Sequence, residues 1–301
     1  MARHHLAGTI GEAADAASGV TGVAWTSKIQ PIRVLGRCGG YTSDLADAMP
    51  WAADIAAAGV PANVTPVRVL NLTLDGNGSC GTIFQNAIND GVARGAVVVV
   101  SAANSNSNVN AANNSPANYH DVITVATSTR TGARTSCSNF GQKVALAASG
   151  GSNLSTPNSG TTPPAAPGYA SKSFHSMAAP HVAGVVSLML SPNAGMTPAQ
   201  VLTIFEAGSR AFPIGTGAER TTAWCGAGIV DAAAALPVEA PSRSARHSPT
   251  EPDIARVNHA LPSSGAVIGG RPTSALPTAW PESTVLWCRM PTTIRLNAPR
   301  P

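Results

Sequence analysis

The segment A-V-V-V-V-S-A-A at residues 96–103 decides the fold class of this 301-residue chain. An apolar, β-branched run of this length is typical of a strand covered on both faces of a parallel sheet. Three other segments have the same character, at 28–35, 67–74 and 121–127. We therefore predict that these four segments are the strands of a buried sheet.

Longer, alanine-rich segments separate these strands. The last of them has a clear start, because Thr197, Pro198 and Gln200 form a capping-box pattern with proline in the first turn. Alternating strands and helices predict an α/β fold with a doubly wound, mostly parallel sheet and helices on both faces. Such sheets bind ligands at the carboxyl ends of their strands. The predicted helices span 5–17, 43–58, 81–94, 176–190 and 197–207.

Composition excludes several classes of partner. Hydrophobic residues make up 44% of the chain and charged residues 11%, which favours a globular protein over a disordered one. The net charge is +4 but the arginines are scattered, so we expect no nucleic-acid partner. No apolar stretch reaches the roughly 18 residues that span a bilayer, so we expect no membrane partner. We also expect a monomer.

The cysteines and the N-terminus bear on the compartment. None of the five cysteines forms a C-x-x-C pair, so a zinc site is not indicated. Their spread suits one or two long-range disulfides in a secreted protein, with at least one thiol left over. The N-terminus lacks the apolar core of a signal peptide, so either the protein is cytosolic or the chain begins downstream of its true start. The cysteines are Cys38, Cys80, Cys137, Cys225 and Cys288.

The sequence divides near residue 236. Residues 1–236 hold the predicted strands and helices, whereas residues 237–301 hold 11 of the 24 prolines and predict a largely disordered tail. The tail is either a linker or the product of a shifted reading frame. Residues 148–175 are rich in Ser, Gly, Thr, Pro and Asn and predict a long surface loop.

Three polar residues stand at the ends of predicted elements. A histidine opens the helix of H-H-L-A-G-T-I-G (4–11), Asn104 follows the strand of V-V-V-V-S-A-A-N, and Ser176 precedes an apolar helix. Taken singly, they are a surface histidine, a turn residue and a helix cap. Together they supply the base, oxyanion donor and nucleophile of serine-dependent acyl transfer.

The motifs around these residues resemble those of the subtilisin-like serine proteases. A-R-H-H-L-A-G-T-I at 2–10 is similar to the family's H-G-T-H-V-A-G-T-I, and S-A-A-N at 101–104 to its A-A-G-N. Residues 174–184 match its G-T-S-M-A-A-P-H-V-A-G, and the likeness covers residues 1–236. The resemblance implies a subtilisin-like peptidase domain over 1–236.

The resemblance also implies roles for single residues. His5 would be the general base, with His4 beside it as a spectator, and His181 would be structural. Ser176 would be the nucleophile, and its backbone N–H together with the Asn104 amide would hold the oxyanion. An extended substrate would add as a strand between two edges. The substrate-binding residues would be Gly39, Gly40, Tyr41, Thr73, Leu74, Asp75, Gly76, Ala102 and Ala103.

By the same resemblance, the protein would be a secreted endopeptidase that cleaves polypeptides through an acyl-enzyme on Ser176. It would need no cofactor for chemistry. Family members often bind structural calcium, but no ligand cluster in this sequence is specific enough to name.

The sequence departs from the family pattern at four places. The family's catalytic aspartate lies on a strand before the histidine, and no aspartate precedes His5, so we expect the domain to lack that first strand. Phe174 and His175 replace Gly-Thr, and a phenylalanine there would hinder substrate approach. Ala103 replaces a glycine, which is tolerable if its backbone angles are negative. Asp75 replaces another glycine and either favours basic P1 residues or is a surface charge.

Two hypotheses remain, a serine endopeptidase and a degenerate subtilase that at most binds peptides.

Overall fold

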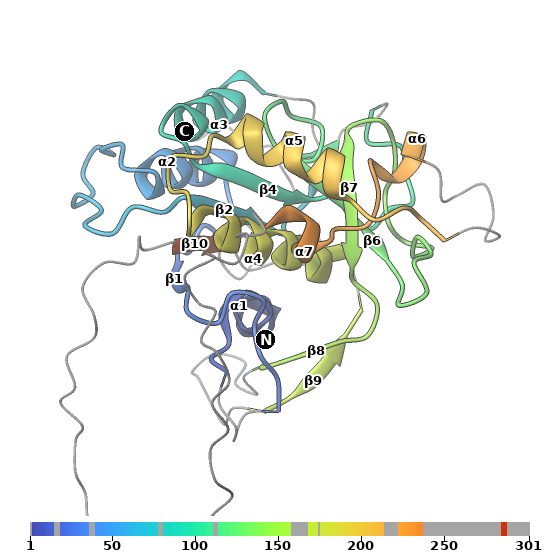
Figure 1. The fold of residues 1–301 in the computed structure, drawn as a ribbon. Helices are drawn as coiled ribbons and strands as arrows, with labels where there is room; N and C mark the ends of the chain where they lie inside the picture. The colour runs from blue at the N-terminus through green and yellow to red at the C-terminus, as the bar shows by residue number, and fades with distance from the viewer. Residues whose placement is uncertain are drawn as a thin grey trace, which may run out of the picture. The chain divides into compact units, whose positions relative to one another are not determined.

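The computed structural model describes residues 2–14, 19–35, 40–77, 81–110, 114–157, 168–173, 175–213, 222–236 and 284–287. Six strands form one sheet in the order β1-β10-β2-β4-β6-β7, and every neighbouring pair is parallel. The prediction of an α/β fold with a parallel sheet is thereby confirmed (Figure 1). The strands are β1 (Lys28–Pro31), β2 (Val69–Leu72), β4 (Val97–Ser101), β6 (Ile123–Ser128), β7 (Val144–Ser149) and β10 (Thr284–Trp287).

The central strands are buried on both faces because their apolar residues alternate between two cores. Leu70 and Val98 point into one hydrophobic cluster, and their neighbours Val69 and Val97 point into the other. All residues of β2, β4 and β6 are buried. A continuous apolar run such as the four valines of β4 suits this placement, because both faces of the strand meet a hydrophobic core.

Helices cover both faces of the sheet. The helices α2 (Thr42–Ala52) and α3 (Thr82–Ala93) pack on one face, and α4 (Ala178–Leu190) and α5 (Pro198–Gly208) pack on the other. Helix α1 (Ala2–Gly11) lies against α4 (Figure 1). Short helices α6 (Thr222–Cys225) and α7 (Ala232–Ala235) follow.

The capping box predicted at Thr197 is confirmed. Its hydroxyl accepts a hydrogen bond from the Gln200 N–H at 3.3 Å, and the Gln200 side chain accepts one from the Thr197 N–H at 2.8 Å. These bonds satisfy backbone donors that the first turn of α5 leaves without helical partners.

Several segments differ from the sequence prediction. The strand β7 was not predicted, and part of the predicted loop at 148–175 forms an antiparallel pair of β8 (Asn153–Ser155) and β9 (Ala170–Lys172). A second short pair joins β3 (Gly76–Asn77) to β5 (Asn114–Ser115). The strand β10 lies inside the tail that was predicted to be largely disordered. The rest of the tail lies outside the described residues.

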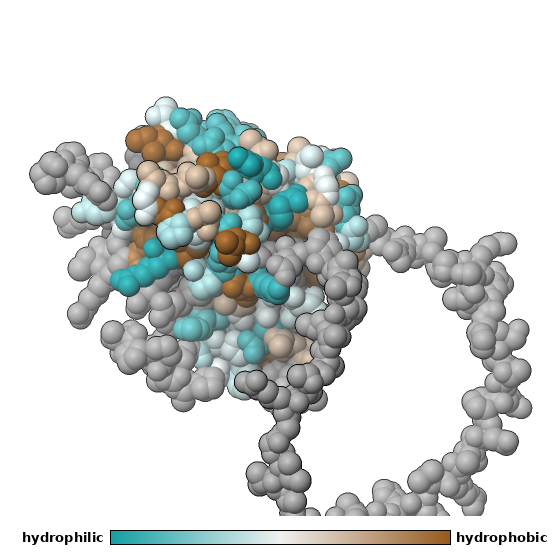
Figure 2. Space-filling model, turned by 90° about the vertical axis from the view of Figure 1, so that its left-hand side faces the viewer, coloured by the Kyte–Doolittle hydropathy of each residue, from teal (hydrophilic) through white to brown (hydrophobic). Residues whose placement is uncertain are grey.

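The surface of the described part is mixed. On the face seen in Figure 2, hydrophobic residues lie singly or in small groups among hydrophilic ones. Among the described residues, no helix has the length and hydrophobicity to cross a membrane.

Candidate active site

Ser176 lies where a short 3₁₀ turn, η1 (His175–Met177), runs into α4. Its exposed fraction is only 4%. The helix that follows is rich in small apolar residues such as Ala179 and Ala183, which lets it pack closely on β2, β4, β6 and β7. Pro180 fits the first turn because its missing N–H has no helical acceptor there. Ser176 is thus held at the start of the most buried helix. Phe174 lies outside the described residues.

Asn104 lies three residues after the end of β4 and is partly exposed. The loop after it is fixed by Asn139, whose side-chain oxygen accepts hydrogen bonds from the N–H groups of Ser105 at 2.8 Å and Ser107 at 2.9 Å. The Asn139 N–H donates in turn to the carbonyl of Ala103 at 3.0 Å. Asn139 is fully buried, and sequence analysis did not single it out. It is the residue that positions the Asn104 loop.

Ala103 has a backbone φ of +81°, so the condition of negative angles that the sequence prediction set for it is not met. This is the left-handed region, which costs a residue with a Cβ about 1–2 kcal/mol. The family motif has glycine here for a physical reason, and the alanine of this chain adds strain beside the predicted oxyanion donor.

Replacing this alanine should therefore stabilise the protein. We expect Ala103→Gly to raise the free energy of unfolding by about 1 kcal/mol, because the relief of strain exceeds the entropic cost of glycine. Urea unfolding would measure the change. Ala102→Gly is the matched control and should lower the stability by about 1 kcal/mol. A destabilised Ala103→Gly variant would contradict this account.

His5 is fully buried. Its two ring nitrogens differ in their hydrogen bonds. Its Nε2 lies 2.9 Å from the carbonyl oxygen of Asn153 and 3.1 Å from that of Ala170. Carbonyl oxygens only accept, so Nε2 carries the proton in the neutral ring. Nδ1 is buried without a hydrogen-bond partner, so His5 makes no hydrogen bond to Ser176. These bonds tie α1 to the β8–β9 pair and give His5 a structural role.

This geometry does not suit the general base that the resemblance predicted at His5. Letter for letter, the family motif H-G-T-H sets its second histidine opposite His5 and its first opposite Ala2. The His5 ring is bound to two carbonyl oxygens. An imidazole that could act as a base therefore belongs at the first histidine position of the family motif. In this chain that position is Ala2, which opens α1.

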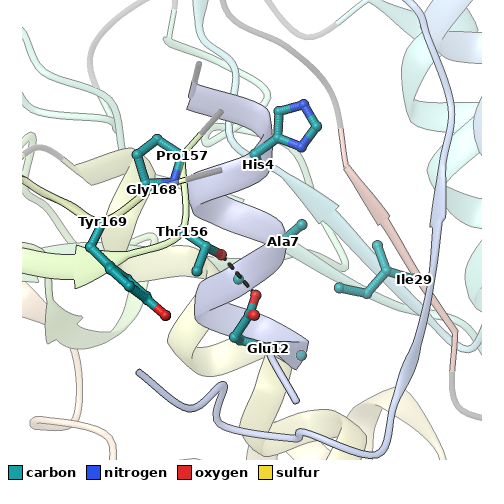
Figure 3. Close-up of a pocket in the computed structure, with 10 residues that line it drawn as sticks. His4, Ala7, Glu12, Ile29, Thr156, Pro157, Gly168 and Tyr169 are labelled. Carbon is teal, nitrogen blue, oxygen red and sulfur yellow. Dashed lines mark hydrogen bonds between the residues drawn. The ribbon is translucent and has the colours of Figure 1, made fainter. Parts of the chain in front are cut away.

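His4, the predicted spectator, lines a cavity of about 420 Å³ beside α1. Figure 3 shows Glu12 and Thr156 facing one another across this cavity, with Tyr169 beyond them. The Thr156 hydroxyl donates to the Glu12 carboxylate at 2.8 Å. The cavity lies between α1 and the β8–β9 segment. The hydrogen bond from Thr156 to Glu12 is a second link between these elements.

His181 in α4 lies near His5. Its Nδ1 is 2.8 Å from the carbonyl oxygen of Met177, as a structural histidine requires. Burial lowers the pKa of His181, and the neighbouring His5 lowers it further. Burial also lowers the pKa of His5, with a smaller contribution from Lys172. Burial therefore disfavours the charged form of both rings.

Acid should destabilise the fold through these two histidines. Free histidine has a pKa near 6.5, so the unfolded chain takes up protons below that pH before the folded protein does. The free energy of unfolding should fall as the pH drops below about 6.5, by up to about 1.4 kcal/mol per pH unit for each ring, until the lowered pKa is reached. Urea unfolding between pH 8 and 5 would show this. His181→Gln should give a shallower slope than the wild type. Equal slopes in the two proteins would contradict the assignment.

Some of the predicted substrate-binding residues are exposed and others are buried. Tyr41 is 53% exposed and Gly76 is partly exposed, as an accessible edge needs. Thr73 and Leu74 are buried instead. Burial raises the pKa of Asp75, so this carboxyl is more than a simple surface charge. Gly39 lies outside the described residues, Gly40 is partly buried, and Ala102 is fully buried.

A larger cavity of about 920 Å³ is lined by the β6–β7 loop around Arg130 and Thr135, by Asn153 and Leu154, and by His181. Neither Ser176 nor Asn104 is among its lining residues.

Among the described residues, no three His, Cys, Asp or Glu side chains gather as they would around a metal ion. Of the predicted disulfide partners, Cys137 is partly buried and Cys225 is buried. The other three cysteines lie outside the described residues.

Known proteins resemble this chain over its folded part. Residues 4–220 match the subtilase family. An extracellular protease of Xanthomonas campestris is 50% identical over 234 residues, which are 77% of this chain and 39% of that protein. An extracellular basic protease of Dichelobacter nodosus is 39% identical over 77% of this chain and 38% of its own length. The chain thus spans about two fifths of these relatives.

Solved structures agree. A protease from Pseudoalteromonas arctica superimposes with a TM-score of 0.72 at 43% identity, over 77% of this chain and 69% of that one. Fervidolysin from Fervidobacterium pennivorans has a TM-score of 0.62 at 27% identity, over 78% of this chain and 36% of its own. The matched family and both structures agree on one fold for this chain. This chain belongs to the subtilase family of serine proteases.

Proposed function

We propose that this chain is a serine-type endopeptidase domain in which Ser176 is the nucleophile, and that its chemistry is slow because Ala2 stands where a proton acceptor belongs. The observation that carries the proposal is the placement of Ser176 at the buried start of α4, within the motif shared with the subtilase family. Its substrates are extended polypeptides, and it acts as a secreted monomer without a cofactor. The extracellular protease names of its relatives support secretion.

The chemistry follows from this placement. Ser176 Oγ attacks the scissile carbonyl carbon, the amine leaves with a proton, and water then hydrolyses the acyl-enzyme. The Ser176 N–H and the Asn104 amide hold the oxyanion. Such donors are worth about 10²–10³-fold in rate each, so slow hydrolysis is expected even without a base.

A second candidate is a subtilase that binds peptides but does not cleave them. It is favoured by the bonds of His5 Nε2 to two carbonyls and by the strained φ of Ala103. Both features weaken the case for catalysis, the first because the His5 ring is bound elsewhere and the second because it strains the backbone beside Asn104.

Cleavage of a denatured protein substrate by the full chain distinguishes the candidates. We expect slow appearance of new peptide amines that Ser176→Ala abolishes, with the same melting temperature in both proteins. Cleavage that survives in Ser176→Ala would overturn the proposal. Peptide binding with no cleavage by the folded wild type would favour the second candidate.

A further inference from the structure

The cavity of about 920 Å³ carries positive charge, and no described acidic residue lines it. Arg130 and Arg134 are in its wall, and seven of its thirteen lining residues are serines or threonines. Guanidinium and hydroxyl groups are donors that bind carboxylates. We propose that this cavity binds the carboxylate of an acidic residue in a polypeptide substrate. This specificity rests on the endopeptidase function proposed for Ser176.

A tight turn presents Arg130 to the cavity. The Gly132 N–H donates to the Thr129 carbonyl at 3.0 Å, which makes Arg130 the second residue of a β-turn. The Thr129 hydroxyl accepts a hydrogen bond from the Ala133 N–H at 3.1 Å and lies 3.0 Å from the Thr131 hydroxyl. Arg130 itself is exposed, and no ion pair joins it to a described residue. Its charge is therefore available to a ligand.

Arg134 supplies a second positive charge at a fixed place. Its Nη1 donates to the side-chain oxygen of Asn106 at 2.8 Å and to the carbonyl of Ser138. Its guanidinium carbon lies 5.1 Å from the centroid of the Phe140 ring. These three partners are uncharged, so they hold the guanidinium without cancelling its charge. Arg134 therefore adds to the positive potential in which Arg130 contacts the ligand.

Two other residues of the wall suit the rest of an acidic side chain. Leu154 is 51% exposed and lines the cavity, so it offers an apolar surface to the methylene groups of a glutamate. Burial lowers the pKa of His181, so this ring is uncharged at pH 8. The positive charge of the cavity at that pH comes from its two arginines.

The cavity lies within reach of a peptide held at Ser176. Ser173 is one of its lining residues, and three Cα–Cα steps of about 3.8 Å put it at most about 11 Å from Ser176. The Ser173 hydroxyl accepts a hydrogen bond from the Ser152 N–H at 2.8 Å, which fixes this end of the cavity. An extended peptide covers about 3.3 Å per residue. An acidic residue about three positions from the scissile bond therefore reaches the cavity.

The residues that flank cleaved bonds test the specificity. The full chain would digest a denatured protein at pH 8, and mass spectrometry would identify the new peptide ends. We expect glutamate to be enriched about fivefold over glutamine at one position within three residues of the cut, which is the upper range for an exposed ion pair. Arg130→Glu should reverse this preference and favour lysine at the same position.

Arg94→Glu is the matched control. It makes the same change of charge at the end of α3, which packs on the opposite face of the sheet from α4. It should keep the preference of the wild type. An unchanged preference in Arg130→Glu would overturn the proposal. An equal loss in both variants would do so too, because net charge rather than the cavity would then select the substrate.

A binding measurement separates this proposal from the chemistry of Ser176. Fluorescence anisotropy would compare two labelled peptides that differ only in having glutamate or glutamine at every third position, with the full-length Ser176→Ala variant as receptor. We expect the glutamate peptide to bind about fivefold more tightly, and Arg130→Gln in the same background to abolish the difference. Equal binding of both peptides would overturn the acidic specificity, even if the wild type cleaves protein. A preference for glutamate that depends on Arg130 would support the cavity, even if the wild type cleaves nothing and the proposed function fails.

Discussion

Ala2→His should increase the rate at which Ser176 reacts by about 100-fold. The residue stands opposite the first histidine of the family motif, one turn before the buried His5, at the start of a helix that packs against the Ser176 turn. An imidazole there can accept the Ser176 proton, and general-base catalysis contributes about 10²–10⁴-fold. We expect the lower end, because no carboxylate in the described residues is placed to orient the new ring.

The rate constant for labelling with a fluorophosphonate measures this directly. Arg3→His is the matched control, since it adds an imidazole to the next residue of α1, about 100° around the helix. It should leave the rate at the wild-type value. Equal acceleration in both variants would mean that any nearby imidazole suffices. No acceleration in Ala2→His would contradict the assignment of this position.

His5→Ala should lower the free energy of unfolding by about 3 kcal/mol. The substitution opens a cavity at a fully buried position and leaves the carbonyls of Asn153 and Ala170 without their donor. His5→Gln keeps an N–H donor of similar reach, so its loss should be about half as large. Urea unfolding would measure both values.

The same variants separate a structural His5 from a catalytic one. If His5 has the structural role, the labelling rate of the folded fraction should stay within about threefold of wild type in both proteins. If His5 were the general base, both variants would label about 10²–10⁴-fold more slowly. A large loss of rate with unchanged stability would overturn our interpretation.

Much of the fold could be predicted because its signals are local. The valine run of β4 and the capping box at Thr197 lie within a few residues, and both appear as predicted. The strand β10 could not be found in this way, since it is four residues long and pairs with Lys28, 256 positions earlier (284 − 28). Its environment exists only once the sheet has formed.

The residues of the candidate site could likewise be predicted only where the signal is local. Ser176 and Asn104 stand at element ends that local pattern identifies. The role of His5 depends on carbonyls 148 and 165 positions away, although a letter-for-letter alignment of its motif already sets His5 opposite the second histidine position. The strain at Ala103 depends on a backbone angle that composition does not reveal.

The most direct test of the account is the site of covalent labelling. The full chain would be treated with a fluorophosphonate, digested and analysed by tandem mass spectrometry, with Ser176→Ala in parallel. We predict one modified residue, Ser176, slow to react in the wild type, and no modification of Ser176→Ala. Labelling at another residue, or equal labelling of both proteins, would contradict the claim that Ser176 is the nucleophile.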